Sequence, residues 1–287
     1  MIDYGQAIVL GLLQGVTELF PVSSLGHSVI LPRLLGWDIG QNDPLFVTFL
    51  VATHFATLVV LLGFFWHDWL RIGSGLLRSL RRRDIGYDDP YARLGWLLIV
   101  GTIPAGFIGL IFESKIEALF ASPQIAAFGL ILNGVLLLAA ELLKRRSDRV
   151  DTASSDSDAF LAWLSWNQAV GIGAMQALAL IPGFSRTGAS LAGGILAGLS
   201  HEDAARFAFL LATPIIGAAS LLRLPRLLGS GAALERGPFL LGALCAGISA
   251  YFAVRFLVRY FRTNRLTPFA VYCAAVGIGS SYLLYGH

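Results

Sequence analysis

The amino-acid sequence predicts an all-α protein that crosses a membrane several times. Hydrophobic residues make up 56% of the chain and charged residues only 14%, whereas soluble domains contain about 45–50% and about 25%. Apolar runs of about twenty residues, the length that a helix needs to cross a bilayer, recur along the chain. These runs do not alternate between apolar and polar positions, as the strands of a membrane barrel would. The expected class is therefore a polytopic α-helical membrane protein.

Six stretches are long and apolar enough to form membrane-spanning helices. They are approximately Phe46–Trp66, Leu94–Phe112, Gln124–Leu143, Phe207–Leu224, Phe239–Val258 and Pro268–Tyr285. Tryptophans gather near the ends of these stretches, as they do in the interfacial belts of membrane proteins. We therefore expect about six transmembrane helices.

Two further apolar stretches, Tyr4–Gly36 and Trp166–Leu199, are interrupted near the middle by Pro, Gly and Ser. Each half is short for a full crossing, and a membrane tolerates such a break only where protein or water surrounds it. We therefore interpret each stretch as a re-entrant helical hairpin whose tip lies inside the membrane. A single kinked crossing helix is the alternative.

The arginines predict the orientation. They are concentrated between the first and second spans, after the third span, and between the fifth and sixth spans. Basic loops favour the cytoplasmic side, so the first hairpin is expected to open toward the outer face. The net charge of +3 arises largely from these loops, and no basic stripe interleaved with aromatic residues indicates nucleic-acid binding. The first residues lack the basic start and cleavage site of a signal peptide, so we expect the whole chain to be retained.

The two halves of the chain resemble each other. QAIVLGLLQG at residues 6–15 is similar to QAVGIGAMQA at residues 168–177, an offset of 162 positions. Three spans separate equivalent points of the two copies, so the second copy is expected to be inverted, as in many secondary transporters. The predicted organisation is one integral membrane domain with repeats over residues 1–145 and 161–287, joined by a flexible cytoplasmic linker over 146–160.

Ionisable side chains inside the two broken stretches are candidates for function, because burying them in a bilayer is costly. Gln14 and Glu18 lie four residues apart on one helical face, and Ser24 and His27 follow them. Arg186 lies at the break of the second stretch. An arginine presents a planar fork of donors that matches phosphate oxygens, and a helix start adds backbone N–H groups. The combination favours phosphate chemistry.

Each of these side chains also has a structural interpretation. Glu18 could pack against a partner, Ser23 and Ser24 could satisfy backbone groups at the break, and His27 could be an interfacial residue. His54, in the middle of the first span, is interpreted as a helix-packing histidine rather than a catalyst.

Glu141 lies near the cytoplasmic end of the third span. It is interpreted as a carboxylate that extends to the membrane surface.

The strings QGVTELFPVSSLGH and PGFSRTGAS resemble the two signature segments of the bacterial undecaprenyl-pyrophosphate phosphatase family, the bacitracin-resistance type. The similarity covers nearly the whole chain. It implies hydrolysis of the C55 isoprenyl diphosphate to the monophosphate carrier of cell-wall synthesis, in the bacterial plasma membrane. The implied partners are the polyprenyl diphosphate lipid and the bilayer, with no nucleic acid, and a homodimer is left open.

The resemblance also assigns roles to individual residues. The implied catalytic residues are Glu18, Ser24, His27 and Arg186. The implied phosphate-binding residues are Ser23, Ser185, Arg186, Thr187 and Ser190. Glu18 and Gln14 are the implied ligands of a divalent cation, Mg²⁺ or Ca²⁺.

Three positions depart from the commonest family pattern. Gln14 stands where many members have Glu, Thr187 where Ser is usual and Ser190 where Thr is usual. The last two changes keep a hydroxyl group. Gln14 removes a charged ligand, so the cation would rest more on Glu18 and on the phosphates of the substrate.

In the expected mechanism Arg186 holds the diphosphate, Ser24 or a water molecule attacks, and His27 moves a proton. Glu18 either orients His27 or binds the cation. A covalent phosphoserine and direct hydrolysis both stay open. The rival functions are a transporter or flippase of the lipid monophosphate and a bifunctional protein that hydrolyses and carries the lipid.

Overall fold

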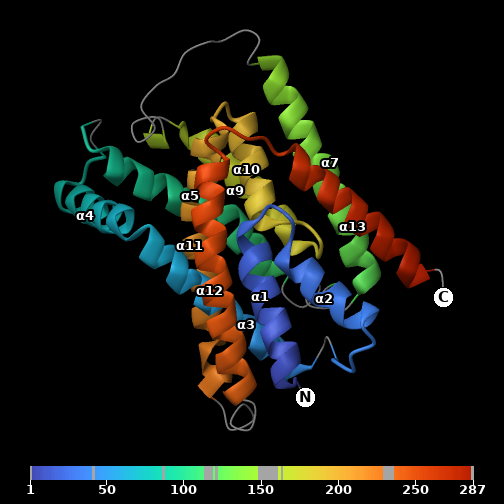
Figure 1. Ribbon diagram of the computed structural model, residues 1–287. Helices are drawn as coiled ribbons and strands as arrows, with labels where there is room; N and C mark the ends of the chain where they lie inside the picture. Colours follow the sequence, from blue (N-terminus) through green and yellow to red (C-terminus); the bar gives the residue numbers. More distant parts are fainter. Residues whose placement is uncertain are drawn as a thin grey trace.

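The structure is a computed structural model that describes residues 2–40, 43–85, 88–112, 119, 122–147, 161–162, 164–228 and 236–285. Within these residues every regular element is helical and no strand is present (Figure 1). The predicted all-α class is therefore confirmed. The predicted linker lies largely outside the described residues, at 148–160, and the preceding helix continues to Ser147.

Among the described residues, six helices are long and apolar enough to cross a membrane, as predicted. They are α3 (Pro44–Phe64), α5 (Pro90–Ile111), α7 (Pro123–Ser147), α11 (His201–Leu228), α12 (Arg236–Tyr260) and α13 (Thr267–Tyr285). Helices α3 and α5 begin a few residues before their predicted starts because a capping signal precedes each apolar run. Asp43 and Asp89 accept hydrogen bonds from backbone N–H groups of the first turns, and a proline follows each of them.

Each broken stretch forms two short helices that pack against each other. The first contains α1 (Tyr4–Leu19) and α2 (Ser24–Leu34). The second contains α9 (Trp166–Gln176), the 3₁₀ turn η1 (Ala177–Leu180) and α10 (Arg186–Leu196). At about 1.5 Å per residue, none of these helices matches the roughly 30 Å hydrocarbon core of a bilayer.

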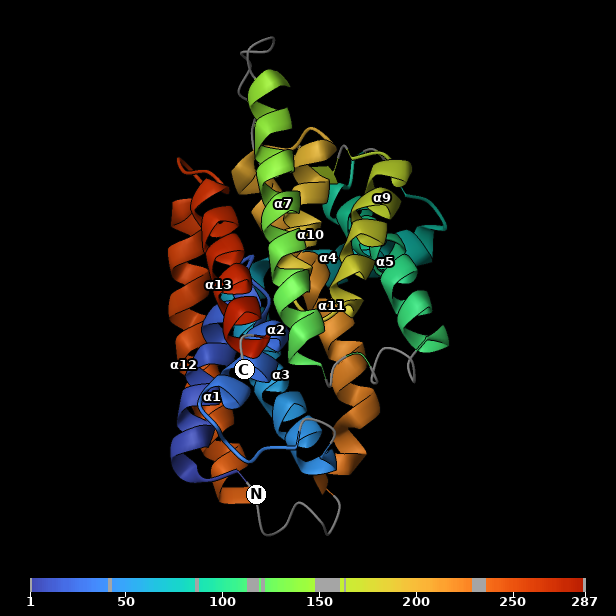
Figure 2. The same cartoon turned by 90° about the vertical axis from the view of Figure 1, so that its right-hand side faces the viewer.

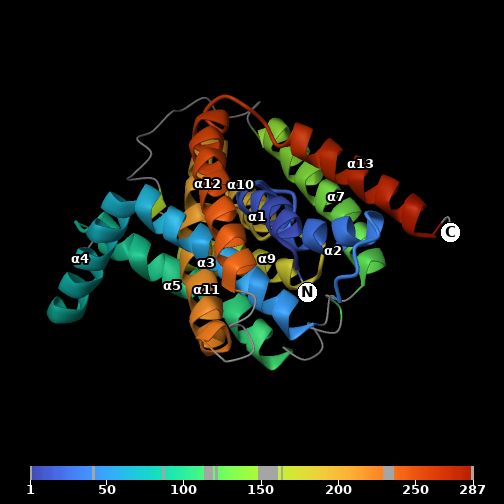
Figure 3. The same ribbon diagram turned by 60° about the horizontal axis from the view of Figure 1, so that its bottom comes forward.

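Helix α4 (Trp66–Arg82) is an element that the sequence analysis did not predict. Its residues were interpreted only as part of a basic loop. The helix projects from the bundle (Figures 1 and 3) and packs on α5 through Ile72, Gly75 and Ser79. Gly75 permits this contact, because a Cβ at that position would lie 2.9 Å from the Cα of Ala92.

The predicted cytoplasmic segments lie at one end of the bundle. Figure 2 shows the end of α7, the start of α9 and the connection between α12 and α13 at the end opposite the N-terminus. Basic residues of α7 and α12 lie at this same end. The prediction that these loops share one side is consistent with this arrangement.

The interpretation of Glu141 as a surface-reaching side chain is wrong. Only 1% of its side chain is exposed. Its Oε1 accepts a hydrogen bond from Arg145 Nε at 3.0 Å. Its Oε2 accepts one from the Leu266 backbone N–H at 3.1 Å and lies 2.8 Å from His201 Nε2. Glu141 therefore joins α7, α11 and the start of α13 instead of extending outward.

Two close helix crossings are related by the sequence repeat. Gly11 of α1 lies against Gly242 of α12, and Gly173 of α9 lies against Gly101 of α5. In both pairs a Cβ on the first glycine would collide with the backbone of the second. Gly11 and Gly173 are 162 positions apart, the offset at which the two halves resemble each other. Small residues let membrane helices approach this closely.

The crossing of α9 and α5 predicts a stability difference between two neighbouring glycines. Gly173→Ala should destabilise the protein by about 1–3 kcal/mol, because the new methyl group overpacks the contact with Gly101. Gly171→Ala is the control in the same helix, since Gly171 is exposed and has no neighbouring atom within 4 Å of a Cβ position. It should be neutral or stabilise by up to about 1 kcal/mol. Thermal unfolding of the purified protein in detergent measures both, and equal melting temperatures would contradict the close packing.

Candidate active site

The breaks in the two short-helix pairs lie against each other. The Ser185 hydroxyl donates to the Phe20 carbonyl at 3.3 Å, and the Thr187 hydroxyl donates to the Glu18 carbonyl at 3.0 Å. Both donors were predicted to bind phosphate. In the structure they also tie the start of α10 to the end of α1, so residues from the two halves meet at one place.

Asn133 of α7 bridges the two breaks. Its Nδ2 donates to the Pro21 carbonyl at 2.9 Å, and its Oδ1 accepts from the Ser185 N–H at 3.1 Å. The side chain is fully buried. The sequence analysis missed Asn133, although a polar residue in the middle of an apolar span was the available signal.

Serine hydroxyls cap the helices that leave each break. Ser23 Oγ accepts from the Gly26 N–H at 3.2 Å, and Ser185 Oγ accepts from the Gly188 N–H at 3.0 Å. Ser23 therefore satisfies a backbone group, the structural role that the sequence left open. Gly183, with φ of +94°, supplies the left-handed conformation that the second break needs.

Glu18 is at the centre of a polar cluster built from both halves of the chain. Ser24 Oγ donates to its Oε2 at 2.5 Å, and Gln14 Nε2 donates to the same oxygen at 3.1 Å. The Arg186 guanidinium donates to Oε1. His54 Nε2 lies 3.2 Å from Oε2. The structure thus brings together Gln14, Glu18, Ser24 and Arg186 as predicted neighbours, and adds His54.

Both ring nitrogens of His54 lie beside hydrogen-bond acceptors. Nδ1 lies 2.7 Å from the Leu50 carbonyl, which can only accept, so Nδ1 carries a hydrogen. Nε2 faces the Glu18 carboxylate, which also accepts. Arg186 and His54 therefore both lie against the Glu18 carboxylate.

His27 lies in a different environment from the one expected. Its Nδ1 is 2.6 Å from the Ser23 carbonyl, and its Nε2 is 2.8 Å from the Tyr272 hydroxyl on α13. Across the part of the chain that the structure describes, no hydrogen bond or ion pair joins His27 to Glu18. The expected orientation of His27 by Glu18 is therefore absent, and His54 is the imidazole beside this carboxylate.

Three buried atoms of the cluster have unused hydrogen-bonding capacity. Gln14 Oε1, Arg186 Nε and Ser190 Oγ have no partner in the structure. Buried polar atoms are normally satisfied, so these atoms are candidates for contact with a ligand. Arg186 and Ser190 lie four residues apart on α10 and therefore share a helical face.

The donor set does not fit a divalent cation held by the protein alone. No group of three or more His, Cys, Asp or Glu side chains suited to a metal occurs among the described residues. Near Glu18 the side-chain oxygens are those of this one carboxylate, the Gln14 amide and the Ser24 hydroxyl, and the Arg186 guanidinium already occupies the carboxylate. Mg²⁺ and Ca²⁺ take about six or more oxygen ligands. A cation at Glu18 and Gln14 stays a prediction.

The helices and the cluster together define a multi-pass membrane protein with a buried polar site at the meeting point of two broken helices. The family profile of the bacitracin resistance protein BacA matches residues 7–279. The chain belongs to this family.

Several curated relatives are similar over almost their whole length. The undecaprenyl-diphosphatase of Mycolicibacterium paratuberculosis is 47% identical over 293 residues, covering 96% of this chain and 95% of the relative. Undecaprenyl-diphosphatase 2 of Chromobacterium violaceum is 45% identical, with 95% and 96% covered. The undecaprenyl-diphosphatase of Acidiphilium cryptum is 44% identical, with 97% of each chain covered.

The bridge made by Asn133 predicts a loss of stability on truncation. Asn133→Ala leaves the Ser185 N–H and the Pro21 carbonyl without this partner, and each buried orphan costs about 1–3 kcal/mol. Leu132→Ala is the control one residue away, where a half-exposed side chain loses apolar contacts only. Thermal unfolding in detergent compares the two. An Asn133→Ala protein as stable as the Leu132→Ala protein would show that the bridge is not needed.

Proposed function

We propose that this protein hydrolyses undecaprenyl diphosphate to undecaprenyl phosphate and inorganic phosphate. The observation that carries the proposal is the cluster of Glu18, Ser24 and Arg186 where the two breaks meet. The family and the curated names of the relatives support the substrate. The product is the lipid carrier used for peptidoglycan and other cell-wall polymers, so the reaction recycles this carrier and gives bacitracin resistance.

Substrate binding begins with charge. The planar guanidinium of Arg186 attracts the diphosphate and binds its terminal phosphate oxygens. The buried Ser190 hydroxyl and Arg186 Nε have donor capacity to spare for the same oxygens. Because the phosphate competes with Glu18 for Arg186, binding weakens the ion pair and leaves the carboxylate free to accept a proton.

Glu18 is then placed to activate Ser24. The Ser24 hydroxyl already donates to Glu18 Oε2 at 2.5 Å, so its proton passes to the carboxylate as the oxygen attacks the terminal phosphorus. The bond from this phosphorus to the bridging oxygen breaks, and the lipid monophosphate leaves with the electron pair. Water then hydrolyses the phosphoserine and releases phosphate. In the alternative, Glu18 takes the proton of a water that attacks directly.

The two histidines have separate roles in this proposal. His54 lies beside Glu18 and positions its carboxylate. His27, one turn into α2, carries a proton through its contact with the Tyr272 hydroxyl. Arg186 and the start of α10 stabilise the charge that develops on the transferred phosphoryl group, which is most of what this reaction requires.

The cluster favours hydrolysis over the alternative of lipid transport. A transporter of the lipid monophosphate needs an anion clamp such as Arg186. It has no use for a serine hydroxyl bonded to a buried carboxylate, whereas a hydrolase needs both groups.

We also propose the placement in the membrane. The short lengths of α1, α2, α9 and α10 support two re-entrant hairpins, and the paired packing of α1 on α12 and α9 on α5 supports an inverted repeat. The basic ends of the spans support a bacterial plasma membrane orientation in which α1 begins on the outer side and the site opens outward. The proposed partners include a second copy of the chain, in a homodimer.

Arg186→Ala should lower phosphate release from C55 diphosphate by about a hundredfold to a thousandfold, because it removes the guanidinium that binds the phosphoryl oxygens. Glu18→Ala should lower it comparably, since Ser24 loses its proton acceptor. Release by purified protein in detergent measures the effect, with Arg146→Ala as the control at the far end of α7. No release from well-folded wild-type protein would favour lipid transport instead.

The same assay tests the cation and the covalent intermediate. Loss of release in EDTA that excess Mg²⁺ or Ca²⁺ restores would support the predicted cation, and release unchanged by EDTA would remove it.

Rapid-quench trapping should show phosphate on Ser24. Turnover that persists in Ser24→Ala without trapped phosphate would replace the serine by direct water attack.

Orientation is tested by cysteine labelling of intact cells with a membrane-impermeant maleimide. Asp38→Cys, in an exposed loop near the start of α3, should react from outside, whereas Asn264→Cys, exposed between α12 and α13, should react only after permeabilisation. The wild type is the control, because Cys245 and Cys273 lie within candidate spans. The reverse pattern would invert the proposed orientation.

A further inference from the structure

Helix α4 has three distinct faces, of which two are exposed. Its packed face contacts α5. One exposed face is apolar, with Trp66, Leu70, Leu77 and Leu80 each exposed by 50–60%. The other carries arginines at positions that share a helical face, namely Arg71, Arg78, Arg81 and Arg82. A helix with this pattern lies along the membrane interface, with its apolar face in the acyl boundary and its basic face toward the headgroups.

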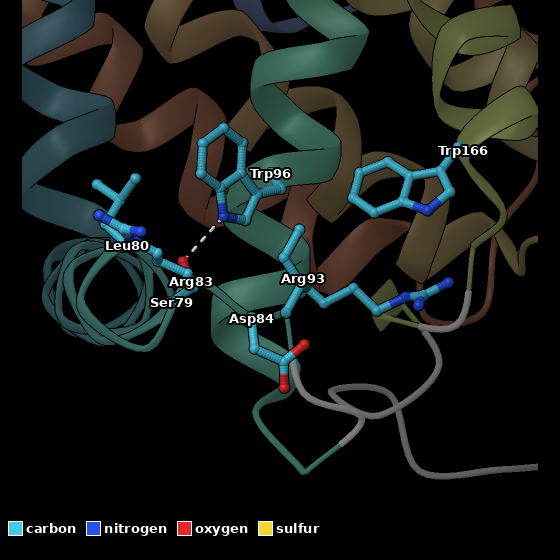
Figure 4. A pocket seen from close by; sticks show the side chains of 8 residues that line it. Ser79, Leu80, Arg83, Asp84, Arg93, Trp96 and Trp166 are labelled. Atoms are coloured by element: carbon cyan, nitrogen blue, oxygen red, sulfur yellow. Dashed lines mark hydrogen bonds between the residues drawn. The ribbon is translucent and has the colours of Figure 1, made fainter.

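A groove opens where this helix ends. Its volume is about 530 Å³, and its lining includes Leu80, Arg83 and Asp84 from the end of α4, Arg93 and Trp96 from α5, and Trp166 from α9 (Figure 4). Two arginines and two tryptophans beside an apolar helix face are a combination suited to a ligand with a charged head and an apolar body. None of these side chains belongs to the cluster around Glu18.

The walls of the groove are held in place. Trp96 Nε1 donates to the Ser79 hydroxyl at 2.9 Å, as the dashed line in Figure 4 shows. The Arg93 guanidinium lies 5.6 Å from the centre of the Trp166 ring and donates to the Leu164 carbonyl at 3.3 Å. Figure 4 shows Arg93 extending between the α5 backbone and Trp166. The basic side chain and both aromatic rings are therefore positioned before a ligand arrives.

Arg83 occupies a position where arginine is unusual. It ends α4 in the left-handed conformation, with φ of +53°, which glycine or asparagine adopts more readily. Its side chain is exposed and lines the groove. Within the described parts of the chain it makes no ion pair. A strained backbone that presents an arginine to a groove indicates a function for that side chain.

We propose that this groove binds the phosphate-containing headgroup of an anionic phospholipid in the leaflet around α4. Arg83 and Arg93 bind the phosphate, Trp96 and Trp166 lie at the headgroup level, and the acyl chains continue along Leu80 and Leu77. The leaflet is the cytoplasmic one under the proposed orientation, and its negative surface attracts a basic segment of this kind. The binding site depends on membrane insertion and is independent of phosphatase activity.

Asp84 and Asp89 are acidic residues close to the groove. Asp89 is occupied by Arg78, whose Nε donates to it at 2.8 Å, and this hydrogen bond lowers the pKa of Asp89. Asp84 also lines the groove and opposes an anion there. Two guanidinium groups against this one carboxylate leave a net positive charge.

The test uses purified full-length protein in detergent. Phosphatidylglycerol is titrated against the melting temperature, with phosphatidylcholine of the same acyl chains as the neutral comparison and soluble glycerol phosphate as the free anion. Phosphatidylglycerol alone should stabilise the wild type. Arg83→Asn and Arg93→Gln should each weaken its apparent affinity by about tenfold, as expected for a lost charge-assisted contact. Arg146→Gln, which removes a charge at the same end of the bundle, should bind as the wild type does.

Several results would overturn the proposal. Equal stabilisation by phosphatidylcholine would show that the groove does not select charge, and equal stabilisation by glycerol phosphate would show a free-anion site instead of a lipid site. Arg83→Asn tests the groove without threatening the fold, because asparagine tolerates the left-handed conformation. Unchanged affinity in both groove variants would place the lipid elsewhere. Since the readout is binding, a failure here is distinct from a failure of the phosphatase assay.

Discussion

The rest of the structure depends on the need to pair one carboxylate inside an apolar bundle. Glu18 lies among membrane-embedded helices, where an unpaired charge would cost several kilocalories per mole. Its partners come from α1, α2, α3 and α10, elements from both halves of the chain. Pairing this one group therefore fixes the positions of four helices, and it places a serine, an arginine and a histidine within reach of a single anion.

The two breaks are possible only because each satisfies the other. A helix that ends inside a membrane leaves N–H and carbonyl groups without partners. Here Ser23 and Ser185 cap the helices that follow, and Asn133 supplies both a donor to the first break and an acceptor to the second. The same hydrogen bonds that make the breaks tolerable bring Glu18 and Arg186 together. The stability of the breaks and the assembly of the site therefore depend on the same hydrogen bonds.

The sequence predicts the fold better than it predicts the contacts between side chains. Apolar length alone locates all six spans, because the bilayer sets their length. Span length does not identify helix α4. This helix can be recognised only from the periodic arrangement of its basic and apolar residues. His54 is also an ionisable residue inside an apolar stretch, but only the packing of α3 on α1 and α12 shows that it faces the carboxylate. The contacts of His27 with Tyr272 and of Asn133 with Pro21 could not be predicted either, because each pair is separated by over a hundred residues in sequence.

A second buried carboxylate shows why burial alone does not identify a site. Glu141, like Glu18, has an arginine and a histidine beside it, and it is as deeply buried. It also accepts a hydrogen bond from the backbone N–H of Leu266, so its oxygens are used to join helix ends. Around Glu18 a serine hydroxyl takes that place, and Arg186 and Ser190 retain buried donor atoms with no partner. A fully hydrogen-bonded cluster such as that around Glu141 stabilises the fold. The cluster around Glu18 contains a nucleophile and donors without partners, which can bind and attack a substrate. This difference separates the proposed active site from the structural junction.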